Sequence, residues 1–268
     1  MPEAHWRRRL LLGASAVLHL LAFGAVLFHA ALWPWALTGV LLNHLLIAAL
    51  GLWPRSRWLG PNWTRLPAAA AARHEIALTI DDGPDPVVTP LVLDLLQRYA
   101  VKATFFVIGE NALRYPALCR EIVRRGHALE NHSQHHRHYF SLLGPRAMAR
   151  ELQEAQDTLI SMTGQRPLFF RAPAGLRNLF LAPILTRLGL RLATWSVRAF
   201  DTRVKDAARV QSQLLGGLQA GAILLLHDGH AARTTQGTPV LLEVLPAVLT
   251  RAADAGLRFV TLRQALLP

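Results

Sequence analysis

Cysteine is almost absent from this sequence, since Cys119 is the only one among 268 residues. A single cysteine excludes an internal disulfide framework. Acidic residues are also scarce, with 17 Asp and Glu against 29 Lys and Arg, which gives a net charge of +12. No basic run is interleaved with aromatic residues, so the charge does not predict a nucleic-acid-binding protein. It favours anionic lipid head groups or a phosphate-bearing substrate instead.

Two long segments near the N-terminus lack charge altogether. Residues 10–33 and 36–53 contain no Lys, Arg, Asp or Glu, and Pro34 lies between them. The first segment is long enough to cross a bilayer. It is too long for a cleaved signal peptide and has no obvious cleavage site. We therefore predict a transmembrane helical hairpin within an anchor at residues 1–60, a linker at 61–74 and a soluble domain at 75–268.

Arginines flank this hairpin on both outer sides, whereas its turn carries none. Because positive charge gathers on the cytoplasmic side of a bacterial-type inner membrane, two spans predict that the soluble domain is cytoplasmic. A single span would place the domain outside. Four polar residues within the apolar segments favour hydrogen bonding between helices, or interfacial placement, over a proton or substrate path: His19, His29, Asn43 and His44.

Apolar strands and amphipathic helices alternate from Glu75 onward, which predicts an α/β fold with a parallel sheet or a barrel. The expected strands are residues 75–80, 102–108, 128–130, 168–171, 192–197, 222–226 and 258–262, and the expected helices are 89–99, 115–125, 145–162, 179–188, 207–218 and 238–255. Polar residues follow several of these strands. The C-terminal strand ends of a barrel share one rim, so these residues are expected to meet there.

Two adjacent carboxylates, Asp81 and Asp82, end the first expected strand and precede Gly83 and Pro84. Neighbouring side chains at a strand end face different ways, so one carboxylate can bind a metal while the other stays free as a base. Asp, Gly and Pro also form ordinary turns. The segment alone therefore leaves both interpretations open.

Two histidines, His132 and His136, follow the third expected strand at a spacing of four. One helical turn would place both imidazoles on one face, which suits a divalent metal. With one carboxylate they make a set that leaves coordination positions open for water and substrate. The alternative is a surface histidine-rich tract, because His135 and His138 are close by, although their spacing makes them weaker ligand candidates.

Three further residues lie at or beyond the ends of expected strands. His227 is a candidate general acid, although a lone histidine there is more often structural. Arg171 would keep nearby aspartates ionised and oriented. Asp201 lies beyond the expected strand 192–197 and would orient either His227 or Arg171.

Taken in order, these motifs resemble the polysaccharide deacetylase family, the NodB-homology or carbohydrate esterase family 4 group. The resemblance runs from about Glu75 to Leu266. It rests on Thr79-Ile80-Asp81-Asp82-Gly83-Pro84, on His132 to His136, on Arg171-Ala172-Pro173-Ala174-Gly175, on Arg198-Ala199-Phe200-Asp201-Thr202 and on Leu225-Leu226-His227. The chain departs from the family at Ala174, where the family has Tyr, at Thr202, where it has Trp, and at Arg198, where it has Asp.

The resemblance implies a distorted (β/α)7 barrel and a hydrolase that removes an N-acyl group, acetyl in the first instance, from an amino sugar in a glycan or glycolipid. It implies Asp81 as general base and a divalent metal, usually Zn²⁺, with Co²⁺ or Ni²⁺ as alternatives. The metal ligands would be Asp82, His132 and His136. Arg171 would position Asp81, and Asp201 would support His227 as general acid. Ala174 would offer a backbone N–H to the oxyanion, and Leu225 would line the acyl pocket.

The departures loosen the link to chitin and peptidoglycan and favour a smaller or lipid-linked glycan. The alternative activity is a deformylase or deacetylase that acts on an undecaprenyl-linked amino sugar. A catalytically inactive glycan-binding membrane protein is disfavoured, because the base, the three ligands and the acid are all present. The expected partners are an N-acylated glycan or lipid-linked sugar and the membrane, with no nucleic acid.

Overall fold

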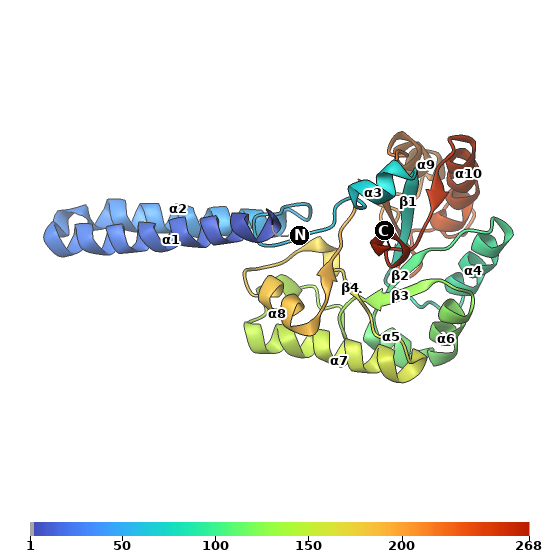
Figure 1. Cartoon of the computed structure of the whole chain (residues 1–268), viewed down its shortest axis with the longest axis horizontal. Helices are drawn as coiled ribbons and strands as arrows, with labels where there is room; N and C mark the ends of the chain where they lie inside the picture. The colour runs from blue at the N-terminus through green and yellow to red at the C-terminus, as the bar shows by residue number, and fades with distance from the viewer. Residues whose placement is uncertain (1–2, 268) are drawn as a thin grey trace.

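A parallel sheet lies at the centre of the computed structural model, which describes residues 3–267 (Figure 1). Its main path runs in the order β5-β4-β3-β2-β1-β7-β6. The bounds are β1 (Glu75–Asp81), β2 (Thr104–Val107), β3 (Ala128–Asn131), β4 (Phe169–Phe170), β5 (Arg191–Leu192), β6 (Val197–Arg198) and β7 (Ile223–His227), while β8 (Arg258–Phe259) pairs with the start of β1. Within the described chain β5 and β6 do not pair, so the sheet is a half-barrel. The expected distorted (β/α)7 barrel is confirmed in this open form.

Helices cover the outer face of the sheet. The six expected helices are confirmed as α4 (Val88–Arg98), α6 (Pro116–Arg124), α7 (Pro145–Thr163), α8 (Leu181–Leu188), α9 (Ala207–Gly216) and α10 (Val240–Asp254). Two short helices were not expected, α3 (Ala68–Ala72) and α5 (Gly109–Arg114). Each is too short to repeat an apolar period, which is the signal that reveals a helix in a sequence.

The expected strand at residues 192–197 is wrong as a single strand. The chain pairs with β4 through β5, leaves the sheet, and pairs with β7 through β6. Between them Ala193 forms an isolated bridge with Trp63. The carbonyl oxygens of Ala193 and Thr194 accept hydrogen bonds from Arg171, at 3.1 and 2.7 Å. A buried guanidinium therefore takes the place of a strand partner here.

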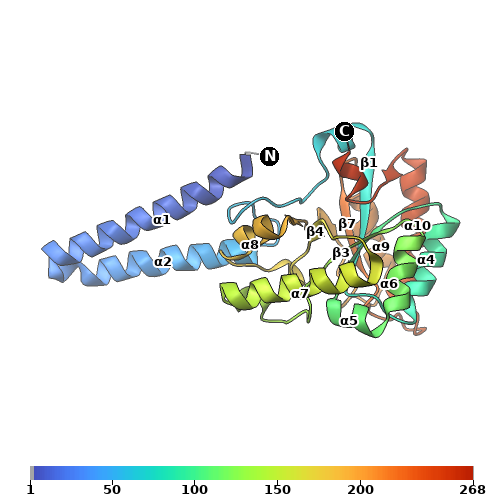
Figure 2. The same ribbon diagram turned by 60° about the horizontal axis from the view of Figure 1, so that its bottom comes forward.

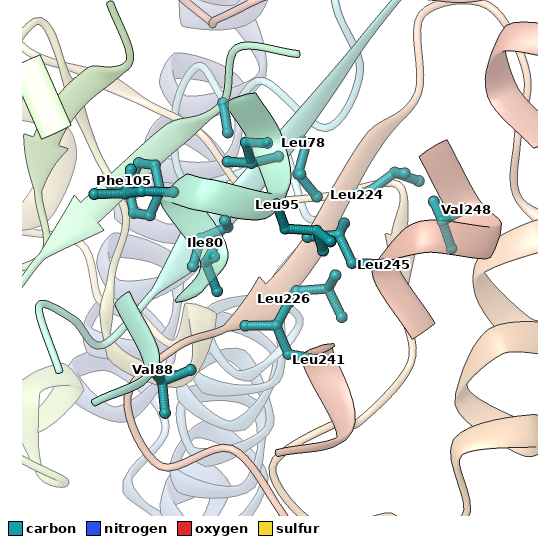
Figure 3. Packing of buried hydrophobic residues seen from close by; sticks show 14 of the residues in the cluster. Leu78, Ile80, Val88, Leu95, Phe105, Leu224, Leu226, Leu241, Leu245 and Val248 are labelled. Carbon is teal, nitrogen blue, oxygen red and sulfur yellow. The ribbon is translucent and has the colours of Figure 1, made fainter. Parts of the chain in front are cut away.

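Alternation along the strands decides which side chains face the helices and which face the interior. Leu78 and Ile80 of β1 lie with Leu224 and Leu226 of β7 against Leu241, Leu245 and Val248 of α10 (Figure 3). Because side chains alternate between the two faces of a strand, Thr79 and Asp81 point the other way. The apolar outer face of β1 thus directs Asp81 toward the barrel interior.

Two N-terminal helices, α1 (Glu3–Phe28) and α2 (Trp33–Leu52), lie side by side and project from the domain (Figures 1 and 2). By length and composition both are able to cross a membrane, and only 6% of each candidate span is buried, unlike a core helix of a soluble protein. Asn43 donates a hydrogen bond to Ser15 across the pair at 2.8 Å, and the rings of His19 and His44 are 5.2 Å apart. The Asn43 bond agrees with the expected helix–helix hydrogen bonding, whereas Nδ1 of His19 and of His44 bonds to a carbonyl of its own helix.

The foot of the hairpin is joined to the domain by hydrogen bonds. The carbonyl of Gly51 accepts from the backbone N–H of Arg177 at 3.1 Å, and the Arg177 guanidinium donates to the carbonyl of Ser56. Asn62 donates to the carbonyls of Pro54 and Ser56 at 2.9 and 3.1 Å. The end of α2 is therefore held against the domain rather than trailing from it.

Residues 61–74 include three side chains that are buried in a cluster on the sheet: Trp63, Leu66 and Ala70. A linker that served only as a spacer would not bury apolar surface in this way. The division into anchor, linker and domain remains a proposal, and this packing favours counting the linker with the domain.

Candidate metal and catalytic site

The C-terminal ends of the strands meet around a cavity of about 240 Å³. In the sheet register Asp81 at the end of β1 lies opposite His227 at the end of β7. Seven of the nine predicted site residues line this cavity: Asp81, Asp82, His132, His136, Ala174, Leu225 and His227. The other two, Arg171 and Asp201, are fully buried behind it. The structure thus brings the predicted set together, as the shared rim of a barrel requires.

The predicted metal ligands form a compact donor set. Donor atoms of Asp82, His132 and His136 all lie within 4.8 Å of one another. Oδ1 of Asp82 is 3.2 Å from Nε2 of His132 and 3.3 Å from Nε2 of His136. The carbonyl oxygen of Arg171 lies 2.8 Å from Nδ1 of His132, which places the ring proton on Nδ1 and leaves the lone pair of Nε2 free to bind a metal. Two imidazoles and one carboxylate in this arrangement fit a divalent ion.

The two histidines converge through a loop, so the expected helical turn is wrong. Ser133 and His136 adopt left-handed backbone conformations, with φ of 66° and 48°. Asn131 Oδ1 accepts from the N–H of Ser133 at 2.9 Å, and Ser133 Oγ accepts from the N–H of His136 at 3.1 Å. Side-chain hydrogen bonds of this kind stabilise a turn in place of a helix. The result is a ring-centroid distance of 4.8 Å between His132 and His136.

Asp81 lies beside the donor set and is held by Arg171. Nη1 of Arg171 donates to Oδ1 of Asp81 at 2.6 Å and to Thr79 at 2.8 Å. The guanidinium also stacks on the ring of Phe106, 4.1 Å from its centroid. Burial lowers the pKa of Arg171, and the Asp81 carboxylate opposes that shift. The free Oδ2 of Asp81 lies 3.8 Å from Nε2 of His132, close enough to share a small reacting molecule with the donor set.

His227 faces the same cavity and is bound on its far side by Asp201. One carboxylate oxygen of Asp201 lies 2.9 Å from Nδ1, and the other accepts from the backbone N–H of His227 at 2.8 Å. Burial alone would lower the pKa of His227, but the charge and hydrogen bond of Asp201 outweigh it and raise the pKa to about 9. An imidazole with this pKa carries a proton at neutral pH.

Asp82 is driven in the opposite direction. Burial would raise its pKa, but the neighbouring imidazoles of His132 and His230 outweigh burial and hold the pKa well below its usual value. Asp82 also has a left-handed φ of 74°, and Ala174 one of 54°. Non-glycine residues rarely adopt this conformation, which costs roughly 1–3 kcal/mol each and gathers at functional sites. The strained positions therefore mark the same rim as the ionised groups.

Several residues in or next to the cavity were not predicted as site residues, and three of them bear on its chemistry or shape. His230 lies at the mouth of the cavity, with Nδ1 3.7 Å from Oδ2 of Asp82. Trp195 forms part of the wall. Asp228 is buried beneath the turn at Gly83, accepts from Thr89, and has its pKa raised by burial to about 7. Only the adjacency of Asp228 to His227 marked it in the sequence.

Spacing predicted that His135 and His138 are weaker ligand candidates than His132 and His136, and neither belongs to the donor set. His135 turns away, with Nδ1 2.9 Å from Glu151. His138 lines the cavity without joining the donor set. Spacing alone does not separate these two positions, because the loop that carries them is irregular.

Comparison with known proteins identifies related enzymes. A sequence model of the polysaccharide deacetylase family matches residues 68–193. The chain is 34% identical over 204 residues to a peptidoglycan-N-acetylglucosamine deacetylase of Listeria monocytogenes, covering 75% of this chain and 41% of that relative. It is 37% identical over 158 residues to a chitooligosaccharide deacetylase of a Bradyrhizobium species, covering 59% of this chain and 72% of that relative.

A solved structure also resembles this fold. The crystal structure of a peptidoglycan N-acetylglucosamine deacetylase matches with a TM-score of 0.69 at 28% identity, and covers 76% of this chain and 92% of that one. The chain spans less than half the length of the Listeria relative. The family model covers the part of the half-barrel from β1 to β5.

Proposed function

The chain belongs to the polysaccharide deacetylase family, and from this premise we propose that it hydrolyses the N-acetyl group of an N-acetylated amino sugar in a glycan or glycolipid. The observation that carries the proposal is the pairing of Asp81 with Arg171 beside the donor set, opposite a protonated His227 in one cavity. Family relatives named as deacetylases of peptidoglycan and chitooligosaccharide support the same reaction.

The donor set fits a divalent ion, and we propose that Asp82, His132 and His136 hold it, with Zn²⁺ as the first candidate. When bound, such an ion would polarise the amide carbonyl and make water more acidic. Asp82, with its depressed pKa, remains an anionic ligand. The Arg171 carbonyl keeps the ring of His132 oriented toward the ion.

The remaining residues move the protons. Asp81, oriented by Arg171, accepts a proton from water as the water oxygen adds to the carbonyl carbon. The backbone N–H of Ala174 is proposed to donate to the oxyanion, and Leu225 to contact the acyl methyl. His227, held by Asp201, donates its proton to the nitrogen as the C–N bond breaks, which releases the free amine and acetate. The proton on Asp81 then passes to solvent, and His227 is reprotonated.

We also propose that α1 and α2 anchor the chain in a bacterial-type cytoplasmic membrane. Both are apolar and exposed, and arginines lie at their outer ends. With two spans, the positive-inside rule places the catalytic domain in the cytoplasm.

The test is release of acetate by the purified full-length protein in detergent, with N-acetylchitooligosaccharides and lipid-linked N-acetylated sugars as separate substrates. Chelation should abolish release, added Zn²⁺ should restore it, and Asp82→Ala should not respond to added metal. Activity that survives both chelation and Asp82→Ala would exclude the metal mechanism. Absence of acyl release from every substrate would exclude the hydrolase itself.

A second candidate is removal of a formyl or acetyl group from an undecaprenyl-linked amino sugar. The observation that favours it is the foot of the hairpin, which packs against the loop that carries Ala174. A substrate embedded in the same membrane would present its sugar close to the cavity. Measuring formate and acetate in the same assay separates the two acyl groups.

A further inference from the structure

Arg198 is a charged residue that the proposed chemistry does not use. It ends β6 and is half-buried, and its guanidinium stacks on Trp195 and Phe200, 5.1 and 4.8 Å from the ring centroids. Its Nε is buried without a hydrogen-bond partner. Among the described side chains, those of residues 6–267, no carboxylate forms an ion pair with it. A buried donor without a partner destabilises the protein, so a ligand that accepts from Arg198 would recover that cost.

Arg198 lines three cavities, and two of them contain aromatic side chains. One is the catalytic cavity. The other has a volume of about 410 Å³ and lies between Arg198, Trp195 and Phe200 on one side and Trp53, Pro54 and Arg55 on the other. Arg55 makes only a long hydrogen bond, 3.4 Å, to the carbonyl of Ser196. The second cavity therefore combines two cations with an apolar aromatic wall.

This second cavity lies at the foot of the membrane hairpin. Trp53, Pro54 and Arg55 follow α2 directly. Gly175, next to Ala174 in the catalytic loop, packs so closely that a Cβ there would lie 2.7 Å from both Pro54 and Trp195. The exit of α2 and the catalytic rim are thus in contact. The second cavity shares Trp195 and Arg198 with the catalytic cavity and therefore lies between it and the exit of α2.

We propose that Arg198 and Arg55 bind the phosphate of a lipid-linked amino sugar whose N-acyl group enters the catalytic cavity. The proposal rests on the proposed function and names its substrate class. A guanidinium matches phosphate oxygens with two parallel hydrogen bonds, and stacking on Trp195 and Phe200 fixes its plane. Trp53, Pro54 and Phe200 would contact the first carbons of the lipid. A neutral polymer offers the two arginines hydroxyl and carbonyl acceptors but no opposite charge, so the phosphate would set the specificity.

Binding to the full-length protein in detergent micelles tests this proposal, with farnesyl phosphate, farnesol and inorganic phosphate as probes in isothermal titration. Farnesyl phosphate should bind at least tenfold more tightly than either other probe. Arg198→Gln should weaken the binding of farnesyl phosphate by about tenfold or more, since a hydrogen bond to a charged group is worth roughly 1.5–3 kcal/mol. Arg251→Gln, which removes an equal charge from the exposed face of α10, is the matched control and should bind like the wild type.

Several outcomes would overturn the proposal. Equal affinity for inorganic and farnesyl phosphate would point to a free phosphate and exclude the lipid. Equal losses in Arg198→Gln and Arg251→Gln would reduce the effect to net charge. Loss of binding on chelation, with Arg198→Gln unaffected, would place the phosphate on the metal. The titration measures binding and needs no turnover. Absence of acyl release would therefore count against the proposed function, while the titration would still test phosphate binding by Arg198.

Discussion

At the scale of single residues, the site shifts the pKa values of neighbouring ionisable groups in opposite directions. Neighbouring imidazoles keep Asp82 ionised, whereas Asp201 keeps His227 protonated, although both side chains are buried. When the surroundings separate the pKa values of nearby groups in this way, one group stays anionic and can bind a metal, and the other stays protonated and can donate a proton. Asp81 is the remaining free carboxylate, and its only strong partner is Arg171.

Asp81→Asn tests the role of the base. The amide keeps the size of the side chain but does not accept a proton, so kcat should fall by about 10²- to 10⁴-fold. The metal content, measured by atomic emission, should stay at the wild-type level, because Asp81 is not one of the three donors. Asp82→Asn is the matched control and should lose metal. A kcat within a few-fold of the wild type in Asp81→Asn would remove Asp81 from the mechanism.

The pH dependence of kcat tests His227. A general acid must be protonated, so kcat should fall as the pH rises through about 9, the raised pKa of His227. Asp201→Asn removes the charge that raises this pKa. The alkaline limb should then move toward lower pH, in the direction of the ordinary histidine value near 6.5. A limb that stays in place in Asp201→Asn would show that another group donates the proton.

At the scale of elements, the last turn of α2 and the catalytic loop are packed together. A Cβ at Gly51 would overlap the carbonyl oxygen of Arg177, which lies two residues beyond Gly175. Arg177 is buried and donates to the backbone at the foot of the hairpin. The loop that carries Ala174 therefore takes its position partly from the membrane segment.

Gly51→Ala should disturb this contact. The added methyl has no room, so we expect a loss of about 1–3 kcal/mol of stability and a lower kcat. Gly24→Ala in α1 is the matched control, because nothing lies within 4 Å of the added Cβ, and alanine favours a helix. Tryptophan fluorescence during thermal unfolding measures both proteins in the same detergent. Equal melting temperatures would show that the foot of the hairpin does not support the domain.

At the scale of the whole molecule, an exposed apolar hairpin extends from an enzyme-like domain (Figures 1 and 2). The second cavity lies where the two parts meet. A lipid-linked substrate can reach the second cavity only if the membrane surface lies on the side of the domain that bears this cavity. The arginines that flank the hairpin predict the cytoplasmic side for the domain.

The predicted cytoplasmic domain is tested with Ser161→Cys on the exposed face of α7. A membrane-impermeant maleimide should label this cysteine only after spheroplasts are permeabilised. Cys119 is fully buried, so the unmodified protein supplies the background. Ready labelling of intact spheroplasts would place the domain outside and imply a single span.

Much of the site could be predicted from the sequence because its ligands follow strands. Asp81, His132 and His227 lie at or next to strand ends, and parallel strands bring such residues to one rim. The helices were predicted for a similar reason, since their apolar faces repeat every three or four residues. Local patterns of this kind depend on the chain alone.

Other features were decided only by tertiary structure. The loop that joins His132 to His136 takes left-handed conformations that its hydrogen bonds stabilise, and Arg171 binds the carbonyls of Ala193 and Thr194 where the chain passes from β5 to β6. Arg198 is a mere departure from the family motif until Trp53 and Pro54 are placed beside it. The sequence by itself therefore determined the order of the motifs and the apolar periodicity of the strands and helices, because both can be read along the chain. Contacts between distant segments depend on how the elements pack, and no local pattern encodes them.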